Sequence, residues 1–157
     1  MVIRMTDIKA VLDAWKPYLH AVQEWEKLVQ GVEPKATGCG PVYELPNPIN
    51  RPNESFAIAD MTNLKAAEPH YHANGETEIY YVLQGSGLVV VGRKEHQVQR
   101  DSMIVTQPDT AHFTIPITDL VLAVINTPPF KPENYIVLAE SRNDVNFDYE
   151  QFARLSR

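Results

Sequence analysis

The sequence predicts an all-β fold, either a β-sandwich or a barrel, with a helical segment at its N-terminus. Its 157 residues suit one domain with a buried core and are few for two domains. From position 54 onward, short apolar runs with a period of two are separated by turn residues at intervals of about ten residues, which is typical of antiparallel strands. A helical period is strong only before position 31. We therefore expect strands to build the core and helices to pack on it.

The bulk composition disfavours several classes of partner. A net charge of −6 and a pI of about 5.3 argue against nucleic acid and anionic membrane surfaces. No apolar run approaches the roughly 20 residues that span a bilayer, and the opening residues lack the layout of a secretory signal peptide. The single cysteine, Cys39, can form no internal disulfide. We expect a cytoplasmic protein with no membrane or nucleic-acid partner.

The segment from 6 to 29 has the pattern of an amphipathic helix. Its apolar residues recur at steps of three and four: Ile8, Val11, Leu12, Trp15, Tyr18, Leu19, Val22, Trp25, Leu28 and Val29. Pro17 lies inside this pattern and has no backbone N–H, so we expect a kink or two shorter helices. The two tryptophans are expected to anchor the segment to the rest of the protein.

The strands follow a stretch rich in glycine and proline. Residues 31–53 are expected to form a linker with one short strand at 42–45. Further strands are predicted around 56–58, within 69–87, and at 87–92, 103–106, 111–115, 120–126 and 135–139. A hairpin turn is predicted at 93–95 and a short helix at 149–155.

Three of the predicted strands are apolar on both faces. They read TEIYYVL, LVVV and LVLAVI, whereas a half-exposed antiparallel strand alternates between apolar and polar residues. The outer face of these strands must therefore be covered. The N-terminal helices and a second copy of the chain are the two candidates, and the second one predicts a homodimer.

Two histidines within the 69–87 stretch indicate half of a metal site. His70 and His72 are two residues apart on an extended segment, so their imidazoles share a face while Tyr71 points away. A carboxylate at the start of the next strand, Glu76 or Glu78, would bind the same ion. A metal held in this way needs a further ligand from elsewhere in the fold.

His112 is the strongest candidate for that further ligand. A strand at 103–106 leads into a tight turn at 107–109, which returns the chain antiparallel. His112 then begins the next strand and can face the same interior as His70 and His72.

These residues resemble the two motifs of the cupin family. The first motif is Gly-x5-His-x-His-x3–4-Glu-x6-Gly; six residues separate Glu78 from Gly85, but five residues separate it from His72. Glu76 fits the first of these spacings and fails the second, so Glu78 is preferred and Glu76 stays a rival ligand. Pro108 and His112 match the second motif. The departures fall mostly on turn positions: Leu64, Arg100, Asp109, Thr110 and Pro116.

The resemblance covers about residues 54–129 and implies a jelly-roll barrel, the double-stranded β-helix of cupins. The whole chain, 1–157, would be one cupin domain: N-terminal helices (1–31) on a barrel (41–140), followed by a C-terminal tail with a short helix (141–157). The resemblance also implies one divalent metal ion on His70, His72, Glu78 and His112. This ligand set contains no sulfur and suits Fe, Mn, Ni, Co or Zn.

Other side chains are expected to serve a substrate beside the ion. Tyr80 lies two residues past Glu78 and shares its face, so it is a candidate proton relay, with simple packing as the alternative. Glu76 is the second candidate for acid–base chemistry. Candidate substrate-binding residues are Thr114, Asn126 and, for an anionic group, Arg51.

Among cupins, the residues and spacing of these motifs resemble those of sugar and sugar-phosphate isomerases. The resemblance implies a small-molecule substrate and an isomerase or epimerase that uses the metal as a Lewis acid. An Fe(II)-dependent dioxygenase would use the same four ligands. A non-catalytic barrel that binds a metal and a small molecule is the third interpretation, because one fold serves many tasks.

Overall fold

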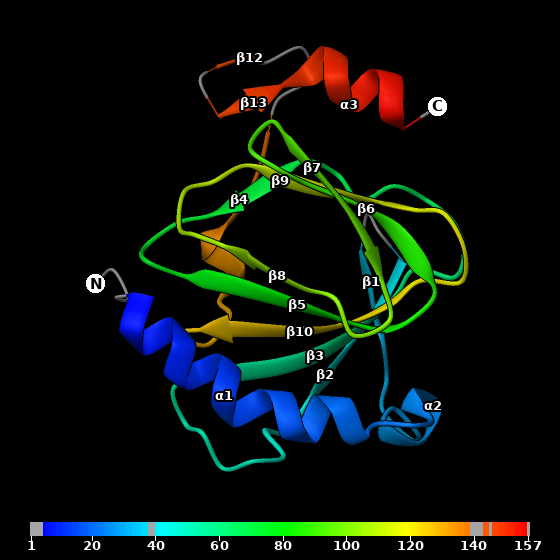
Figure 1. Ribbon diagram of the computed structural model, residues 1–157, viewed down its shortest axis with the longest axis vertical. Helices are drawn as coiled ribbons and strands as arrows, with labels where there is room; N and C mark the ends of the chain where they lie inside the picture. Colours follow the sequence, from blue (N-terminus) through cyan, green and yellow to red (C-terminus); the bar gives the residue numbers. More distant parts are fainter. Residues whose placement is uncertain (1–4, 38–39, 139–142, 145, 157) are drawn as a thin grey trace.

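The computed structural model describes residues 5–37, 40–138, 143–144 and 146–156 of the chain, so Cys39 lies outside them. Two antiparallel sheets face each other, and Figure 1 shows them as two layers with a helix outside each layer. The first sheet has the order β1-β2-β3-β10-β5-β8 and the second the order β11-β4-β9-β6-β7. The prediction of an all-β cupin-type fold with N- and C-terminal helices is confirmed.

The bounds of the strands follow the chain order. Those of the six-stranded sheet are β1 (Lys35–Thr37), β2 (Gly40–Leu45), β3 (Ser55–Asp60), β5 (Thr77–Gln84), β8 (Met103–Thr106) and β10 (Val121–Thr127). Those of the five-stranded sheet are β4 (His70–His72), β6 (Ser86–Val91), β7 (Lys94–Gln99), β9 (His112–Pro116) and β11 (Tyr135–Val137). A small third sheet pairs β12 (Asn143–Asp144) with β13 (Phe147–Asp148), and a 3-10 turn, η1 (Pro132–Asn134), precedes β11.

Helix α1 (Met5–Ala21) covers the outer face of the six-stranded sheet. Trp15 and Leu19 are buried there against apolar side chains of β3, β5 and β10. The indole of Trp15 donates to Glu54, and that of Trp25 donates to Gln84. Both tryptophans therefore anchor the segment, as predicted.

The helical segment breaks at a different place from the one that its proline suggests. Pro17 lies inside α1, and the chain leaves the helix only after Ala21 before it forms α2 (Trp25–Leu28). Buried residues on both sides of Pro17 keep the first helix packed on the sheet, which compensates for the missing backbone donor. The alternative of two helices is thus the one that the structure adopts.

Helix α3 (Tyr149–Leu155) covers the outer face of the five-stranded sheet. Phe113 is fully buried beneath it, with ring centroids 5.0 Å from Phe152 and 6.3 Å from Phe147. The apolar outer faces of the strands are therefore covered by helices of the same chain. A homodimer is not needed for this purpose, and it stays a prediction.

Some strands were missed because their sequences do not alternate. The expected linker contains β1, which is exposed at all three positions, whereas the strand expected at 42–45 forms the second part of β2. The expected hairpin at 93–95 overlaps β7, whose sequence KEHQVQ is almost entirely polar. Edge strands with few buried residues carry no period of two, so the pattern does not reveal them. No helix among the described residues combines the length and apolar character needed to cross a membrane.

Gly85 makes the tight passage from β5 to β6 possible. Its φ is +76°, and a Cβ atom there would lie 2.5 Å from the carbonyl of Asp119. Only glycine meets both conditions without strain. This turn sends the chain from one sheet to the other, beside the buried residues Leu120 and Val82 that pack between the sheets.

Candidate metal centre

Four side chains from both sheets converge between the layers. His70 and His72 come from β4, His112 from β9 and Glu78 from β5. Each offers one ligand atom, these atoms all lie within 4.8 Å of one another, and all four residues are buried. The structure thus brings together the four residues that the cupin motifs single out.

Strand register places the histidines. His70 is the direct cross-strand partner of His112, and their ring centroids are 4.2 Å apart. His72 follows on the same face of β4, because alternate side chains of a strand point to the same side. The pairing of β4 with β9 therefore joins the two histidine motifs at one point.

A tight turn places the carboxylates. The amide N–H of Glu76 donates to the carbonyl of Ala73, and the two residues between them, Asn74 and Gly75, have φ values of +57° and +77°. Two central residues with positive φ characterise a type I′ turn. The turn accounts for the five residues between His72 and Glu78 and returns the chain so that Glu76 and Glu78 both approach His72.

Backbone carbonyls orient two of the imidazoles. His70 Nδ1 lies 2.9 Å from the carbonyl oxygen of Glu68, and His112 Nδ1 lies 3.0 Å from that of Thr110. A carbonyl only accepts, so in both rings Nδ1 carries the proton. In the neutral rings Nε2 then keeps its lone pair, which is the form that binds a metal.

Glu78 joins two of the imidazoles. Its Oε1 lies 2.9 Å from His112 Nε2, and its Oε2 lies 2.9 Å from His72 Nε2. Burial raises the pKa of Glu78, but His72 and His112 outweigh it and hold that pKa well below its usual value. The carboxyl group is therefore ionised, as a metal ligand must be.

The environment of His70 keeps its imidazole neutral. Burial and the neighbouring His112 lower the pKa of His70 well below its usual value, against the opposing effect of Glu78. His70 thus has the protonation state of a metal ligand at neutral pH.

The surroundings of His72 indicate that the four converging side chains fit a cation. Its Nδ1 lies 3.2 Å from Glu76 Oε1 and its Nε2 2.9 Å from Glu78 Oε2, yet neither nitrogen is aligned for a hydrogen bond. Burial lowers the pKa of His72, but Glu78 and Glu76 raise it to about 10. This side chain lies between two buried carboxylates in a site that favours positive charge. Three imidazoles and a carboxylate without sulfur fit a divalent ion such as Zn or Fe(II).

Glu76 lies on the Nδ1 side of His72, whereas Glu78 lies on its Nε2 side. Glu76 is fully buried and accepts from Asn126 Nδ2 at 2.8 Å and from Asn134 Nδ2 at 2.9 Å. Asn126 Nδ2 also lies 3.3 Å from Glu78 Oε2. Glu78 is one of the four converging ligands, whereas Glu76 is not and contacts His72, Asn126 and Asn134.

The other predicted residues have different surroundings. Tyr80 is buried on the inner face, with its ring centroid 6.1 Å from that of His112. The Thr114 hydroxyl is buried and has no hydrogen-bond partner among the described residues. Arg51 pairs with Glu54, the carboxylate that accepts from Trp15 beneath helix α1, and the structure does not bring it to the metal ligands.

Three residues around the ligands were missed by the sequence interpretation. The ring of Tyr135 stacks on His70 at a centroid distance of 4.3 Å, and its hydroxyl donates to Glu68. Phe130 lies edge-on to His72 at 6.1 Å, and Asn134 binds Glu76. These residues follow a proline-rich stretch in which no period marks them. The only available signal was a cluster of aromatic and amide residues after β10.

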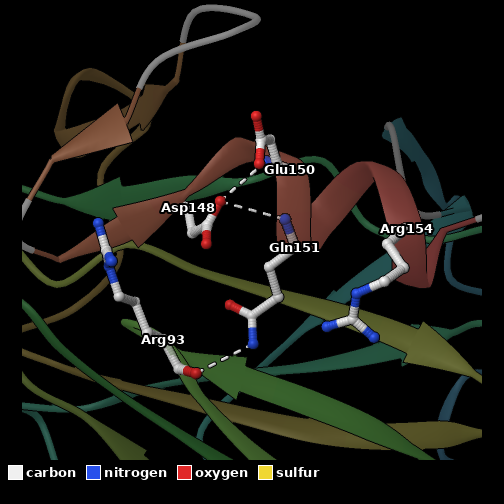
Figure 2. A pocket seen from close by; sticks show the side chains of 5 residues that line it. All are labelled: Arg93, Asp148, Glu150, Gln151 and Arg154. Atoms are coloured by element: carbon white, nitrogen blue, oxygen red, sulfur yellow. Dashed lines mark hydrogen bonds between the residues drawn. The ribbon is translucent and has the colours of Figure 1, made fainter.

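A separate pocket of about 390 Å³ lies beside helix α3, on the outside of the five-stranded sheet (Figure 2). It is lined by Arg93, Asp148, Glu150, Gln151 and Arg154. Asp148 accepts from the first amides of α3, and Gln151 donates to the carbonyl of Arg93. These polar groups hold α3 in place, and none of them belongs to the metal ligands.

Comparison with solved structures supports the fold. The nucleoside dehydratase Pac13 of Streptomyces is 12% identical, with a TM-score of 0.60 over 70% of this chain and 87% of its own. A protein from Planctomyces limnophilus is 23% identical, with a TM-score of 0.59 over 74% and 97% of the two chains. Oxalate decarboxylase of Lactobacillus farciminis is 20% identical, with a TM-score of 0.59 over 70% of this chain and 34% of its own.

No curated protein matches the sequence. A family model does match, over residues 53–153, which contain all four converging side chains. The chain belongs to the AraC-like ligand binding domain family, one of the cupin families.

Proposed function

We propose that this protein is a metal-dependent enzyme that acts on a small, oxygen-rich molecule, in the manner of sugar isomerases and epimerases. The observation that carries the proposal is the convergence of His70, His72, Glu78 and His112. They would hold one divalent ion, which would act as a Lewis acid toward substrate oxygens. The fold neighbours include enzymes, a dehydratase and a decarboxylase, and variants of the dehydratase have been solved with uridine.

The side chains around the ligands have roles that this chemistry needs. Tyr80, which is buried with its ring centroid 6.1 Å from that of His112, would hold or move a proton. The hydroxyl of Thr114, which has no hydrogen-bond partner within the described part of the chain, supplies a hydrogen-bonding group for a substrate. The burial of all four ligands excludes bulk water from the reacting groups, which strengthens electrostatic interactions there.

Two measurements test this proposal. The first is elemental analysis of untagged protein and of H112A, in which we expect about one divalent ion per chain and a strong loss in the variant. The second is a screen of sugars in deuterium oxide for metal-dependent exchange of a carbon-bound proton with solvent. Equal metal content in both proteins would overturn the site. Metal binding with no exchange in any sugar would overturn the isomerase chemistry.

An Fe(II)-dependent dioxygenase is the second candidate. The set of three imidazoles and one carboxylate, without sulfur, suits Fe(II) as well as the non-redox metals. Consumption of dioxygen that requires both Fe(II) and a substrate would favour it over the isomerase.

A non-catalytic barrel is the third candidate, and the family itself favours it, because its description is that of a ligand-binding domain. Tight binding of a metal and a sugar without turnover would support this function.

We also propose that the chain forms one cytoplasmic domain that assembles as a homodimer. All the major elements pack on the same pair of sheets, which supports a single domain.

The edge strand β8 supports the homodimer. It leaves Met103, Ile104 and Val105 half-buried, and an uncharged edge strand is suited to pairing with a second copy of the chain. A monomeric mass by light scattering at micromolar concentration would contradict the dimer.

A further inference from the structure

We propose that Glu76 is a positioning residue, a buried carboxylate that orients His72 from behind so that Nε2 of that ring faces the other ligands. This inference rests on the proposed metal site. It concerns a residue outside the set of four converging ligands.

The three histidines are oriented in two different ways. Backbone carbonyls lie beside Nδ1 of His70 and Nδ1 of His112. Beside His72 Nδ1 lies the carboxylate of Glu76, with Oε1 3.2 Å away in a contact that is not aligned as a hydrogen bond. A carboxylate at this nitrogen favours the tautomer with a proton on Nδ1 and increases the basicity of Nε2. Glu76 thus occupies at His72 the place that a carbonyl occupies at the other two rings.

Glu76 is itself held by two amides from distant parts of the chain. Asn126 at the end of β10 donates to Oε1, and Asn134 in η1 donates to Oε2. Asn134 cannot turn its amide around freely, because its Oδ1 accepts from Asn74 Nδ2 at 2.7 Å. Asn74 belongs to the type I′ turn that separates His72 from Glu76. The hydrogen-bond network of Glu76 therefore leads back, through Asn134, to the turn that follows His72.

The donor pattern requires a carboxylate at this position. Both asparagine amides present N–H groups to Glu76, and the proposed orientation of His72 presents a third. A glutamine in its place has the same shape but carries its own N–H₂ group, which would face one of these donors. E76Q is therefore expected to disturb the network without leaving a cavity.

The test measures zinc affinity by competition with a chromophoric chelator, with no assay of activity. We expect E76Q to bind zinc about 10- to 100-fold more weakly than the wild type, as is typical when an outer partner of a ligand is lost. E54Q is the matched control, because Glu54 is also a buried carboxylate but holds helix α1 through Trp15. E54Q is expected to bind zinc like the wild type.

A compensating variant tests the role of Asn134. In E76Q/N134D the new aspartate can accept from the glutamine and from Asn74, so we expect zinc affinity to recover at least part of the loss. A double variant that binds no better than E76Q would overturn the role given to Asn134.

Nuclear magnetic resonance adds a readout that a merely structural role would not move. In the zinc-loaded protein labelled with ¹⁵N-histidine, we expect the Nδ1 proton of His72 to exchange faster with solvent in E76Q. The corresponding protons of His70 and His112, which face backbone carbonyls, should be unchanged.

The outcomes separate the two proposals. If the wild type binds no zinc, the metal site fails, and the inference fails with it. If the wild type binds zinc, H112A does not, and E76Q matches the wild type, only the role of Glu76 is overturned. Equal losses in E76Q and E54Q would mean general destabilisation and would also overturn it.

Discussion

His70 and His112 face each other directly across two antiparallel strands, with their ring centroids 4.2 Å apart, although they come from distant parts of the chain. Their Nδ1 atoms are both held by backbone carbonyls two residues earlier in sequence. The same local arrangement is thus used twice to aim a nitrogen into the space between the sheets. This symmetry is the structural basis of the proposed metal site.

Metal addition should stabilise the protein. A ligand that binds only the folded state at 100 times its dissociation constant contributes about 2.7 kcal/mol. We expect zinc to raise the melting temperature of the chelator-treated wild type by several degrees in differential scanning fluorimetry. H112A, which lacks one of the four converging ligands, should show a much smaller shift. Equal shifts in both proteins would place the zinc elsewhere.

Replacing Trp15 should strongly destabilise the fold. The side chain is almost fully buried between α1 and the six-stranded sheet, and its ring centroid lies 5.2 Å from that of Phe56. Truncation of a buried aromatic residue costs about 3 to 5 kcal/mol, so W15A should lose that much in urea unfolding. The control is K9A on the same helix, which removes an exposed pair with Asp13 and should change stability by less than about 0.5 kcal/mol. A loss below 1 kcal/mol in W15A would contradict the anchoring role of α1.

Gly85 and Gly31 offer a matched pair of glycine substitutions. Both have positive φ values, +76° and +77°, but a Cβ at Gly85 would collide with the backbone of Asp119, whereas a Cβ at Gly31 meets nothing within 4 Å. G31A should therefore cost only the backbone strain of about 1 kcal/mol. G85A adds the steric conflict and should cost about 3 kcal/mol or prevent folding. Similar unfolding midpoints for the two variants would argue against the close approach at Gly85.

Tyr81 should titrate at unusually high pH. Burial, together with the hydrogen bond to Asp101 Oδ1 at 2.5 Å and the charge of that carboxylate, raises the pKa of Tyr81 to about 12. Because the folded pKa lies above the unfolded value of about 10, this contribution to stability is fully present below pH 10. It is lost as the pH rises from 10 to 12.

Absorbance of tyrosinate at 295 nm checks this assignment. Y81F should lack the last titration step, and D101N should move that step to lower pH. At neutral pH Y81F should lose about 1 kcal/mol, a modest value because Asp101 is partly exposed. An unchanged titration curve in Y81F would show that another tyrosine is responsible.

Much of the fold was predictable because its central elements carry strong periods. Strand β8 and helix α3 have the bounds that the sequence predicts. The exposed edge strands β1 and β7, one in each sheet, were not predicted. Each is stabilised by hydrogen bonds to a neighbouring strand and buries few side chains. Backbone pairing leaves no mark on the sequence, so such strands emerge only from the assembled sheet.

The sequence by itself determined three histidines and two rival carboxylates as candidate metal ligands, since their spacing follows from strand alternation and from the cupin motifs. Only the tertiary structure distinguished Glu78 from Glu76, because a type I′ turn places the two carboxylates at different nitrogens of His72. It also placed Asn134 on Glu76, and Arg51 on Glu54, which accepts from Trp15 of helix α1. Side chains that act through neighbours are specified by contacts between distant segments, and no local pattern encodes such contacts.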